Sequence, residues 1–314
     1  MNLRASTLIL LTAGCLTAAG FTPAAADTTR LPGSIDLPCA ARILRQDAAW
    51  YLPSQIPRGL VWLQHGFARA ETNVAGLART LAAAGYLVFT PSLPFLNLDG
   101  CTLQNLGDNT PFLDQVARLF GTATDPAGQL ATALDAAAER AGITPPAHPQ
   151  QFVFIGHSAG GEAVEYVAHR LHTSYPSAWA NLRGLILLDP VKSLLGANTD
   201  TALADLASTE LPILSVSGPP GPCNNFGSGT TALQTHLHRP VLGVRLTTGE
   251  HTDAEGGTTD PLAELFCGTP QPGNTSILRE LTVGWAGRYF SGATDYLTGT
   301  TALTPASFQI LAGT

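Results

Sequence analysis

Short apolar runs alternate with longer stretches of helical spacing along most of the chain. Runs such as Leu60–Gln64 (LVWLQ) are apolar at every position but the last, the pattern of a strand that is buried on both faces. Residues 159–171 instead place Val164, Val167 and Leu171 at the spacing of one helix face. The same patterns predict strands at 60–64, 87–90, 151–155, 185–188, 213–216 and 241–246, and helices at 73–84, 159–171 and 276–289.

Two further helices are marked by their first residues. Thr110-Pro111 and Asp125-Pro126 each resemble an N-cap followed by proline at the first helical position, and the second helix is expected to end near Gly142. Apolar strands separated by helices predict an α/β fold with a mostly parallel central sheet and helices on both faces. No long linker or shift in composition divides the chain, so we expect one domain at 27–314, with residues 27–45 as an N-terminal extension.

The first 26 residues have the pattern of a secretory signal peptide. Arg4 supplies a positive charge, an apolar or small stretch runs to Phe21, and three alanines at 24–26 offer a cleavage site. We therefore expect an extracellular or periplasmic protein. A membrane anchor and lipidation at Cys15 are the alternatives. No later run of about 20 apolar residues could span a bilayer, and Leu11 stands one residue too early for a lipobox.

Export changes how the cysteines are interpreted. Cys39, Cys101, Cys223 and Cys267 remain after the leader, and an even number in an oxidising compartment predicts two disulfides. Three pairings are open. Proximity along the chain favours Cys39 with Cys101 and Cys223 with Cys267. A zinc site is the alternative, but no CxxC or paired-histidine spacing supports it.

Composition narrows the function classes. The chain has 314 residues, 45% of them hydrophobic, and a formal net charge of -7. Such a chain can bury a sizeable core. It lacks the basic footprint of a nucleic-acid-binding protein. No metal-binding or phosphate-loop motif stands out, so no cofactor is expected.

One motif carries candidate chemistry. The predicted strand QFVFI runs into Gly156–Gly160 (GHSAG), and a helix follows at once. This strand–turn–helix setting is the one in which G-x-S-x-G forms a nucleophile elbow, with Ser158 on the sharp turn. A chance match in a glycine-rich loop is the alternative, but it would lack the flanking strand and helix. Ser158 is thus the candidate nucleophile.

An elbow of this kind needs an oxyanion hole built from backbone N–H groups. The strand LVWLQ ends in His65-Gly66-Phe67, at the place where an earlier strand supplies one donor. We assign the two donors to the N–H groups of Phe67 and Ala159. The alternative is that His65 and Phe67 are simply packed loop residues.

His251 is the candidate general base. It follows the last predicted strand and lies C-terminal to the serine, as the Ser…Asp…His order of such enzymes requires. Loops at the carboxyl ends of parallel strands form the ligand site in open α/β sheets. His65 and His157 lie inside the two motifs and are expected to be structural. A solvated loop histidine is the alternative for His251.

Asp189 is the candidate acid. The loop at 218–225, where the acid commonly stands, holds no carboxylate, whereas the strand GLILL ends in Asp189-Pro190. A buried aspartate at a strand end needs a partner, and a histidine that becomes cationic is one. A turn aspartate before proline is the alternative role. Asp253 and Glu255 are rivals, but they crowd His251, and their side chains are expected to face solvent or order the loop.

These segments together resemble the chlorophyllase branch of α/β hydrolases. The resemblance rests on GHSAGG at 156–161, LLDPV at 187–191 and GEHTD at 249–253, and it extends roughly from Leu60 to His251. It implies that the acid lies in the LDPV segment, which agrees with Asp189. Plant chlorophyllases carry arginine where this chain has Ala159, which argues against chlorophyllide esters. A looser similarity to secreted cutinase-like polyester hydrolases covers the oxyanion loop.

The sequence therefore predicts a secreted serine hydrolase of carboxylic esters that works through an acyl-enzyme intermediate, with an ester of unknown identity as substrate. The runner-up is a lipase or cutinase-like polyester hydrolase, for which 94–98 and 218–225 would form an apolar rim. A non-catalytic binding protein on the same scaffold would be expected to have lost Ser158 or His251. A peptidase is a further alternative, because such a triad also serves amides.

Overall fold

A computed structural model describes residues 28–296 and 307–314, so the predicted signal peptide at 1–26 lies outside the described residues. In the described part of the chain the strands form one sheet of order β1-β2-β4-β3-β5-β6-β7-β8-β9. The strands are β1 Thr29–Cys39, β2 Arg42–Leu52, β3 Leu60–Gln64, β4 Leu87–Pro91, β5 Phe152–His157, β6 Leu182–Leu188, β7 Ile213–Ser217, β8 Gly243–Leu246 and β9 Phe308–Leu311. From β4 to β8 the pairing is parallel, and it is antiparallel at both edges.

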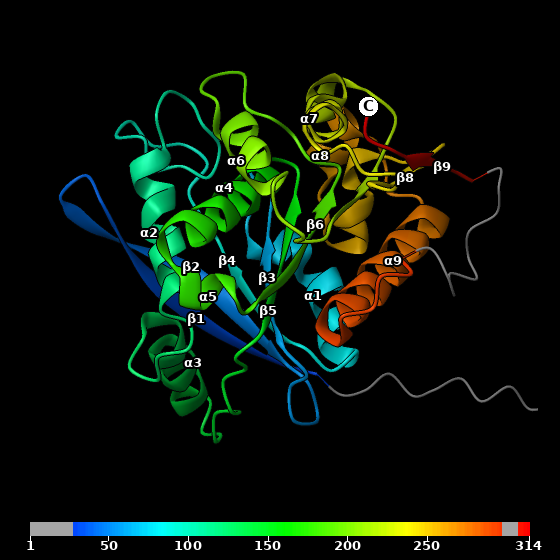
Figure 1. The fold of residues 1–314 in the computed structure, drawn as a ribbon. Helices are drawn as coiled ribbons and strands as arrows, with labels where there is room; N and C mark the ends of the chain where they lie inside the picture. The colour runs from blue at the N-terminus through cyan, green and yellow to red at the C-terminus, as the bar shows by residue number, and fades with distance from the viewer. Residues whose placement is uncertain (1–27, 297–306) are drawn as a thin grey trace, which may run out of the picture.

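Helices cover both faces of the sheet (Figure 1). The α-helices are α1 Ala75–Ala83, α2 Thr110–Gly121, α3 Gln129–Arg140, α4 Ala159–Ser174, α5 Pro176–Trp179, α6 Asn198–Leu206, α7 Ser228–His236, α8 Pro261–Cys267 and α9 Pro272–Ser291. Apolar residues of α1 and α9 pack on one face, and those of α2, α3, α4, α6 and α7 pack on the other. The α/β fold predicted from the hydrophobic pattern is confirmed.

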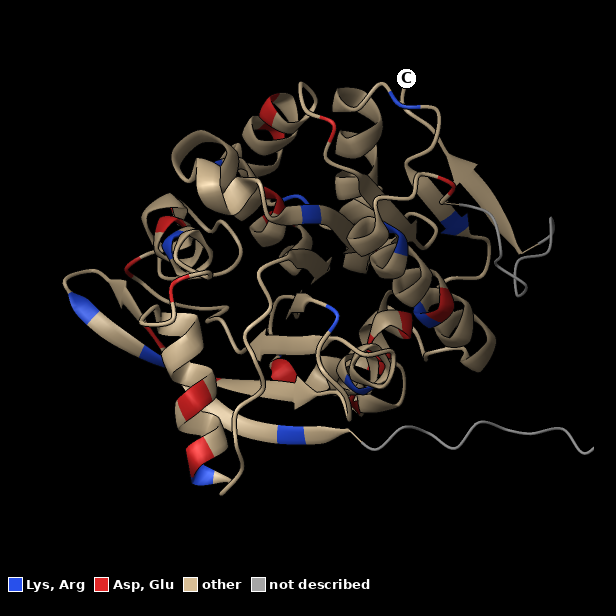
Figure 2. Cartoon of the chain, turned by 60° about the horizontal axis from the view of Figure 1, so that its bottom comes forward, with Lys and Arg blue, Asp and Glu red and all other residues tan. Residues whose placement is uncertain are grey.

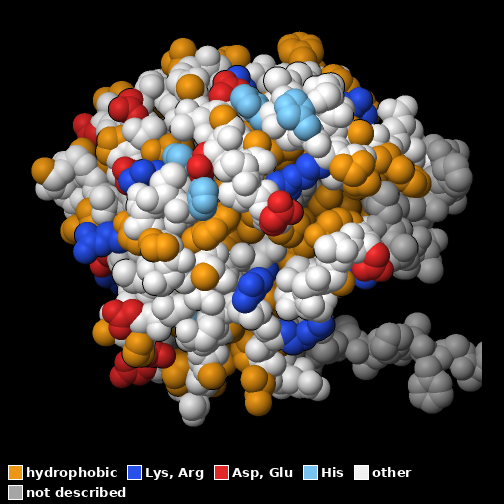
Figure 3. All heavy atoms as spheres, in the orientation of Figure 1, with side chains coloured by type: hydrophobic (Ala, Val, Ile, Leu, Met, Phe, Trp, Pro, Cys, Tyr) orange, Lys and Arg blue, Asp and Glu red, His pale blue; other side chains and the backbone are white. Residues whose placement is uncertain are grey.

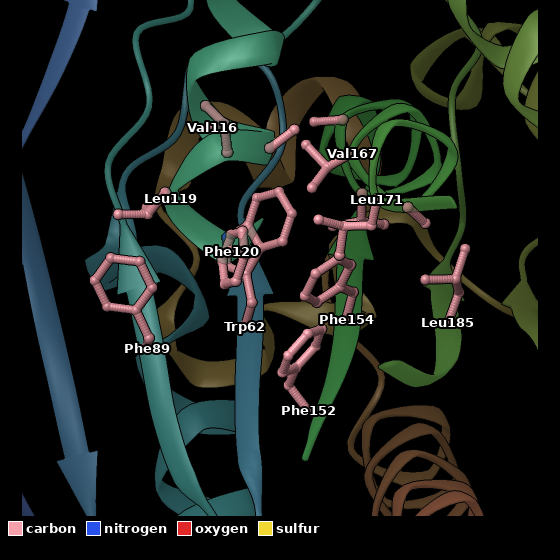
Figure 4. Packing of buried hydrophobic residues seen from close by; sticks show 14 of the residues in the cluster. Trp62, Phe89, Val116, Leu119, Phe120, Phe152, Phe154, Val167, Leu171 and Leu185 are labelled. Carbon is pink, nitrogen blue, oxygen red and sulfur yellow. The ribbon is translucent and has the colours of Figure 1, made fainter. Parts of the chain in front are cut away.

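The two cores follow from the alternation of side chains along each strand. In β3, Trp62 points to the face of α2 and α4, whereas Val61 and Leu63 point to the face of α1 and α9. Trp62, Phe120 and Phe154 meet in the first core (Figure 4), where the rings of Trp62 and Phe120 have centroids 4.6 Å apart. Strands buried on both sides are therefore apolar at most positions.

The expected N-terminal extension at 27–45 was a wrong interpretation. Residues 29–39 form β1 and residues 42–45 begin β2, and these two strands pair along their whole length and extend the sheet. Leu31, Ile35 and Leu37 of β1 are buried in the core. The connecting turn places Ala40 and Ala41 at φ of 50° and 59°. Hairpin turns with two positive φ values normally carry asparagine or glycine, so two alanines left no turn signal in the sequence.

One helix start was also misplaced. Helix α2 does begin at Thr110, with Pro111 in its first turn, but α3 begins at Gln129 after Gly128. The Asp125 carboxylate instead accepts a hydrogen bond from the backbone N–H of Ala127 at 2.8 Å. Aspartate before proline forms turns as readily as it caps helices, and here the turn precedes the helix.

Two disulfides join distant elements, and the favoured pairing is confirmed. Cys39–Cys101 ties the β1–β2 hairpin to the segment between β4 and α2, and Cys223–Cys267 ties the loop after β7 to the end of α8. None of these four cysteines is therefore a free thiol. Among the described residues, no helix has the length and apolar character needed to cross a bilayer.

Candidate active site

Ser158 stands on the tight turn between β5 and α4. Its backbone adopts φ 57° and ψ -126°, outside the regions that L-residues prefer. A Cβ on Gly156 would lie 2.3 Å from the carbonyl oxygen of Gly160, and a Cβ on Gly160 would lie 2.5 Å from that of His65. Only glycine fits at either position, which explains why the motif surrounds the serine with glycines.

His251 contacts Ser158 from the segment that follows β8. It opens the short helix η3 (His251–Ala254), which follows β8 after a four-residue turn. Its Nε2 lies 2.9 Å from Ser158 Oγ. The strand ends bring together two side chains that are 93 residues apart.

Asp189 follows β6 directly and completes a chain of hydrogen bonds. One carboxylate oxygen, Oδ2, lies 2.6 Å from His251 Nδ1. The other, Oδ1, accepts the backbone N–H of Gly218 at 3.0 Å, and both accept from the Asn224 side chain at 3.2 Å. Burial alone would raise the pKa of Asp189, but these bonds and the charge of His251 outweigh it, so its pKa is lowered. The carboxylate is thus held ionised although it is buried.

Asn224 is a residue that the sequence analysis did not single out. It lies in the loop after β7, where a carboxylate was sought, and its amide donates to Asp189 instead of replacing it. Its Oδ1 accepts the backbone N–H groups of Gly221 and Gly227 at 2.8 and 2.9 Å. The loop is therefore folded around the amide. The adjacent asparagines in GPCNN were the available signal.

The segment after β3 borders a cavity at Ser158. Gly66 and Phe67 line a space of about 210 Å³ together with Ser158 and His251. A Cβ on Gly66 would stand 2.8 Å from the Cβ of Ser158, so the loop passes close to the serine. Within the described part of the chain, no backbone carbonyl accepts the N–H of Phe67 or of Ala159. Neither N–H group is therefore paired with the backbone.

The histidines inside the two motifs are buried. His157 Nε2 donates to the carbonyl oxygen of His251 at 2.9 Å and so supports the backbone of that residue. Burial, with a smaller contribution from His251, lowers the pKa of His157 to about 4. His65 donates from Nδ1 to the carbonyl of Gly66, and burial lowers its pKa to about 4 as well. Both are neutral near pH 7.

The rivals for the acid position, Asp253 and Glu255, do not contact the His251 ring. Both are buried, so of the two roles expected for them, facing solvent or ordering the loop, the first does not apply. Asp253 accepts the backbone N–H groups of Glu250 and Gln271, each at 2.7 Å. Glu255 takes two hydrogen bonds from Arg69, at 2.8 and 2.6 Å. Their hydrogen bonds order the loop that carries His251, which is the second of the two expected roles.

The fold of this chain is shared with other proteins of known structure. A mostly parallel sheet with a serine on a strand–turn–helix elbow is the arrangement of the α/β-hydrolase fold. The structure is similar to the esterase domain of a Rhodothermus marinus protein, with a TM-score of 0.50 and 16% sequence identity over 83% of this chain and 100% of that domain. No protein-family model matches the chain, and no curated protein matches its sequence. The likeness shows the shared fold.

Proposed function

We propose that the chain is a serine hydrolase that cleaves carboxylic esters, with Ser158 as nucleophile, His251 as general base and Asp189 as the residue that orients and stabilises His251. The proposal rests mainly on one observation, the unbroken series of hydrogen bonds from Ser158 Oγ through His251 to Asp189. The solved esterase domain of similar fold supports ester chemistry. No step requires a cofactor.

The mechanism transfers an acyl group twice. His251 Nε2 accepts the Ser158 proton while Ser158 Oγ bonds to the ester carbonyl carbon. The N–H groups of Phe67 and Ala159 hold the resulting oxyanion. The C–O bond to the alcohol then breaks, and His251 returns the proton to the leaving oxygen. Water, deprotonated by His251, releases the acid and restores Ser158.

Asp189 makes the cationic state of His251 accessible. A carboxylate whose pKa is lowered stays charged over the working range, and at 2.6 Å it stabilises the imidazolium and selects the tautomer with hydrogen on Nδ1. Its position after β6, not after β7, agrees with the resemblance to the chlorophyllase branch. We infer a relationship to that branch on this ground.

Export and domain organisation are part of the proposal. We infer that residues 1–26 are a signal peptide and that 27–314 form one domain. The disulfides support an oxidising compartment, and a sheet with strands from Thr29 to Leu311 supports a single unit. An extracellular or periplasmic location follows.

A specific observation favours a second candidate, a lipase or cutinase-like polyester hydrolase. Helix α8 contributes Ala263 and Cys267 to the Ser158 cavity. The same helix leaves Leu262, Leu265 and Phe266 largely exposed. Phe67 at the cavity packs edge-on against Phe95, and both rings are partly exposed. An apolar rim of this kind suits substrates presented at an interface.

Hydrolysis of p-nitrophenyl esters from acetate to palmitate tests the proposal. Wild-type protein should turn over at least part of the series, and Ser158→Ala should lower kcat by roughly 10⁴–10⁶-fold, because the nucleophile is lost. An optimum at short chains supports an esterase, and one at long chains supports the interfacial alternative. A Ser158→Ala variant that keeps wild-type turnover would refute the mechanism. A wild type that is inactive on every ester would favour a binding protein.

A further inference from the structure

A second cavity, which Ser158 does not line, lies on the side of the molecule where α1 and α9 cover the sheet. It has a volume of about 920 Å³ and opens between these two helices and the short helix η4 (Gly256–Thr258). Thr275, Arg279 and Val283 line it from α9. These residues are spaced at i, i+4 and i+8, so they lie on one face of the helix.

Arg279 is an arginine without a partner. No hydrogen bond or ion pair joins it to another described residue, and its Nε is shielded from solvent. Burial lowers the pKa of Arg279, and no neighbouring acid offsets that effect. A guanidinium carries five N–H donors and a permanent charge. Shielding its Nε from water without an acceptor is costly, so a ligand that supplies an acceptor here would be favoured.

The backbone around Arg279 leaves room for its guanidinium. A Cβ on Gly76 would lie 2.7 Å from Arg279 Nη2, and a Cβ on Gly256 would lie 3.0 Å from the same atom. Gly256 also has φ of +54°, which disfavours other residues. Two glycines from distant parts of the chain thus border the guanidinium.

Thr275 supplies an independent observation. Its side chain is 8% exposed, it lines the cavity, and its Oγ1 has no hydrogen-bond partner. An ideal Cβ on Gly256 would be 3.7 Å from Thr275 Oγ1 and 3.0 Å from Arg279 Nη2, so the hydroxyl and the guanidinium border the same point. A buried hydroxyl without a partner and one edge of a guanidinium that border the same point of the cavity wall indicate an acceptor that fills the space between them.

We propose that this cavity binds a monocarboxylate with an apolar body, whose carboxylate pairs with Arg279 and accepts from the Thr275 hydroxyl. Guanidinium and carboxylate match in a two-bond geometry. Pro270, Pro272 and Val283 provide apolar walls for the remainder. Glu264 and Glu280 also line the cavity, and their charge disfavours a dianion such as phosphate.

The site lies back to back with the Ser158 cavity. Glu255 and Ala263 line the cavity of Ser158, whereas Gly256 and Glu264 line this one. The segment 255–264 therefore forms a wall of both. The acid released by ester hydrolysis belongs to the proposed ligand class, but carboxylate binding does not depend on hydrolysis and is measured without it.

Titration calorimetry with octanoate tests the proposal. Wild-type protein should bind octanoate, and Arg279→Gln should weaken that binding at least about tenfold, because the charged partner is lost. Ser276→Trp is the second variant. Ser276 is exposed at the cavity, so a large ring there should block entry without disturbing the core. Ser291→Trp, at the exposed end of α9, is the matched control and should bind like wild type.

Octanol and inorganic phosphate define the ligand class. Octanol should bind at least about tenfold more weakly than octanoate, and phosphate should not compete. If octanoate also binds in the Ser158 cavity, wild-type protein should show two binding sites, and Arg279→Gln should keep only the one at Ser158. Equal octanoate binding by wild type, Arg279→Gln and Ser276→Trp would overturn the proposal. No binding to wild type at about 10 mM octanoate, or tighter binding of phosphate, would do the same.

Discussion

Asp189 holds its carboxylate at the end of β6 with a backbone φ of 44°. A non-glycine residue in that region costs on the order of 1–3 kcal/mol, so surrounding contacts must maintain it. Here Gly218, Asn224 and His251 all donate to the carboxylate. The residue is constrained from three sides, which is the geometry expected where orientation of His251 matters.

Asp189→Asn tests this role. The amide retains the shape but cannot stabilise a cationic His251, and it favours the wrong tautomer, so kcat on p-nitrophenyl esters should fall by about 10³–10⁴-fold. Circular dichroism should show an unchanged fold. Asp205→Asn is a matched control, because Asp205 contacts His169 and His172 instead of His251. Comparable rates for wild type and Asp189→Asn would remove Asp189 from the mechanism.

At the scale of elements, the turn from β5 to α4 is limited by backbone contacts. Gly156→Ala would place a methyl group 2.3 Å from the Gly160 carbonyl, and backbone atoms there cannot move aside cheaply. We expect a loss of about 2–4 kcal/mol in unfolding free energy, measured by urea denaturation. Gly273→Ala, with no atom near the added Cβ, should be neutral or slightly stabilising. Similar stability of both variants would contradict the assigned crowding.

The Cys223–Cys267 disulfide joins two elements that border the Ser158 cavity. Replacing both cysteines with serine should cost about 2–4 kcal/mol of unfolding free energy and raise KM, because the short helix η2 (Pro222–Gly227) and α8 lose their link. The Cys39→Ser, Cys101→Ser variant is the control. It should lose comparable stability with little change in KM, since neither cysteine lines that cavity. A normal KM in the first variant would separate the disulfide from substrate binding.

Charges of both signs are scattered over the whole molecule in small groups (Figure 2), and apolar side chains are interspersed with them on the face in Figure 3. Because the surface charges are dispersed, the strongest dependence of the unfolding free energy on pH should come from buried titratable groups. His65 and His157 each have a pKa of about 4 in the folded protein, against about 6.5 when unfolded. Between these values the unfolded chain binds more protons at these two sites, so the stability that the two neutral histidines contribute should be full above pH 6.5 and decline towards pH 4.

Urea unfolding from pH 7 to pH 5 measures this decline, which two histidines can make as steep as about 3 kcal/mol per pH unit. His157→Gln removes one of the two protons and should roughly halve the slope. Asp189 acts in a lower window. Its lowered pKa stabilises the fold above the ordinary aspartate value near 4, and that contribution is lost as pH falls further. A slope unaffected by His157→Gln would contradict the assignment.

The local patterns of the chain determined the parallel strands, most helices and the turn at Ser158, because burial on both faces and glycine spacing are written in consecutive residues. They also placed Asp189 and His251 at strand ends on one edge, where the side chains lie within hydrogen-bond distance of their neighbours. The catalytic roles remain predictions. The β1–β2 hairpin escaped because its two turn residues are alanines, which give no turn signal, and β9 escaped because its partner β8 is distant along the chain.

Only the tertiary structure decided how the polar side chains are satisfied. Asn224 donates to Asp189 from 35 residues away, and Arg69 pairs with Glu255 across 186 residues. The unpartnered Arg279 is equally invisible in sequence, because a missing partner can be recognised only when every neighbour is in place. Periodicity reports which face of an element is buried, whereas the pairing of buried polar groups depends on the assembled fold.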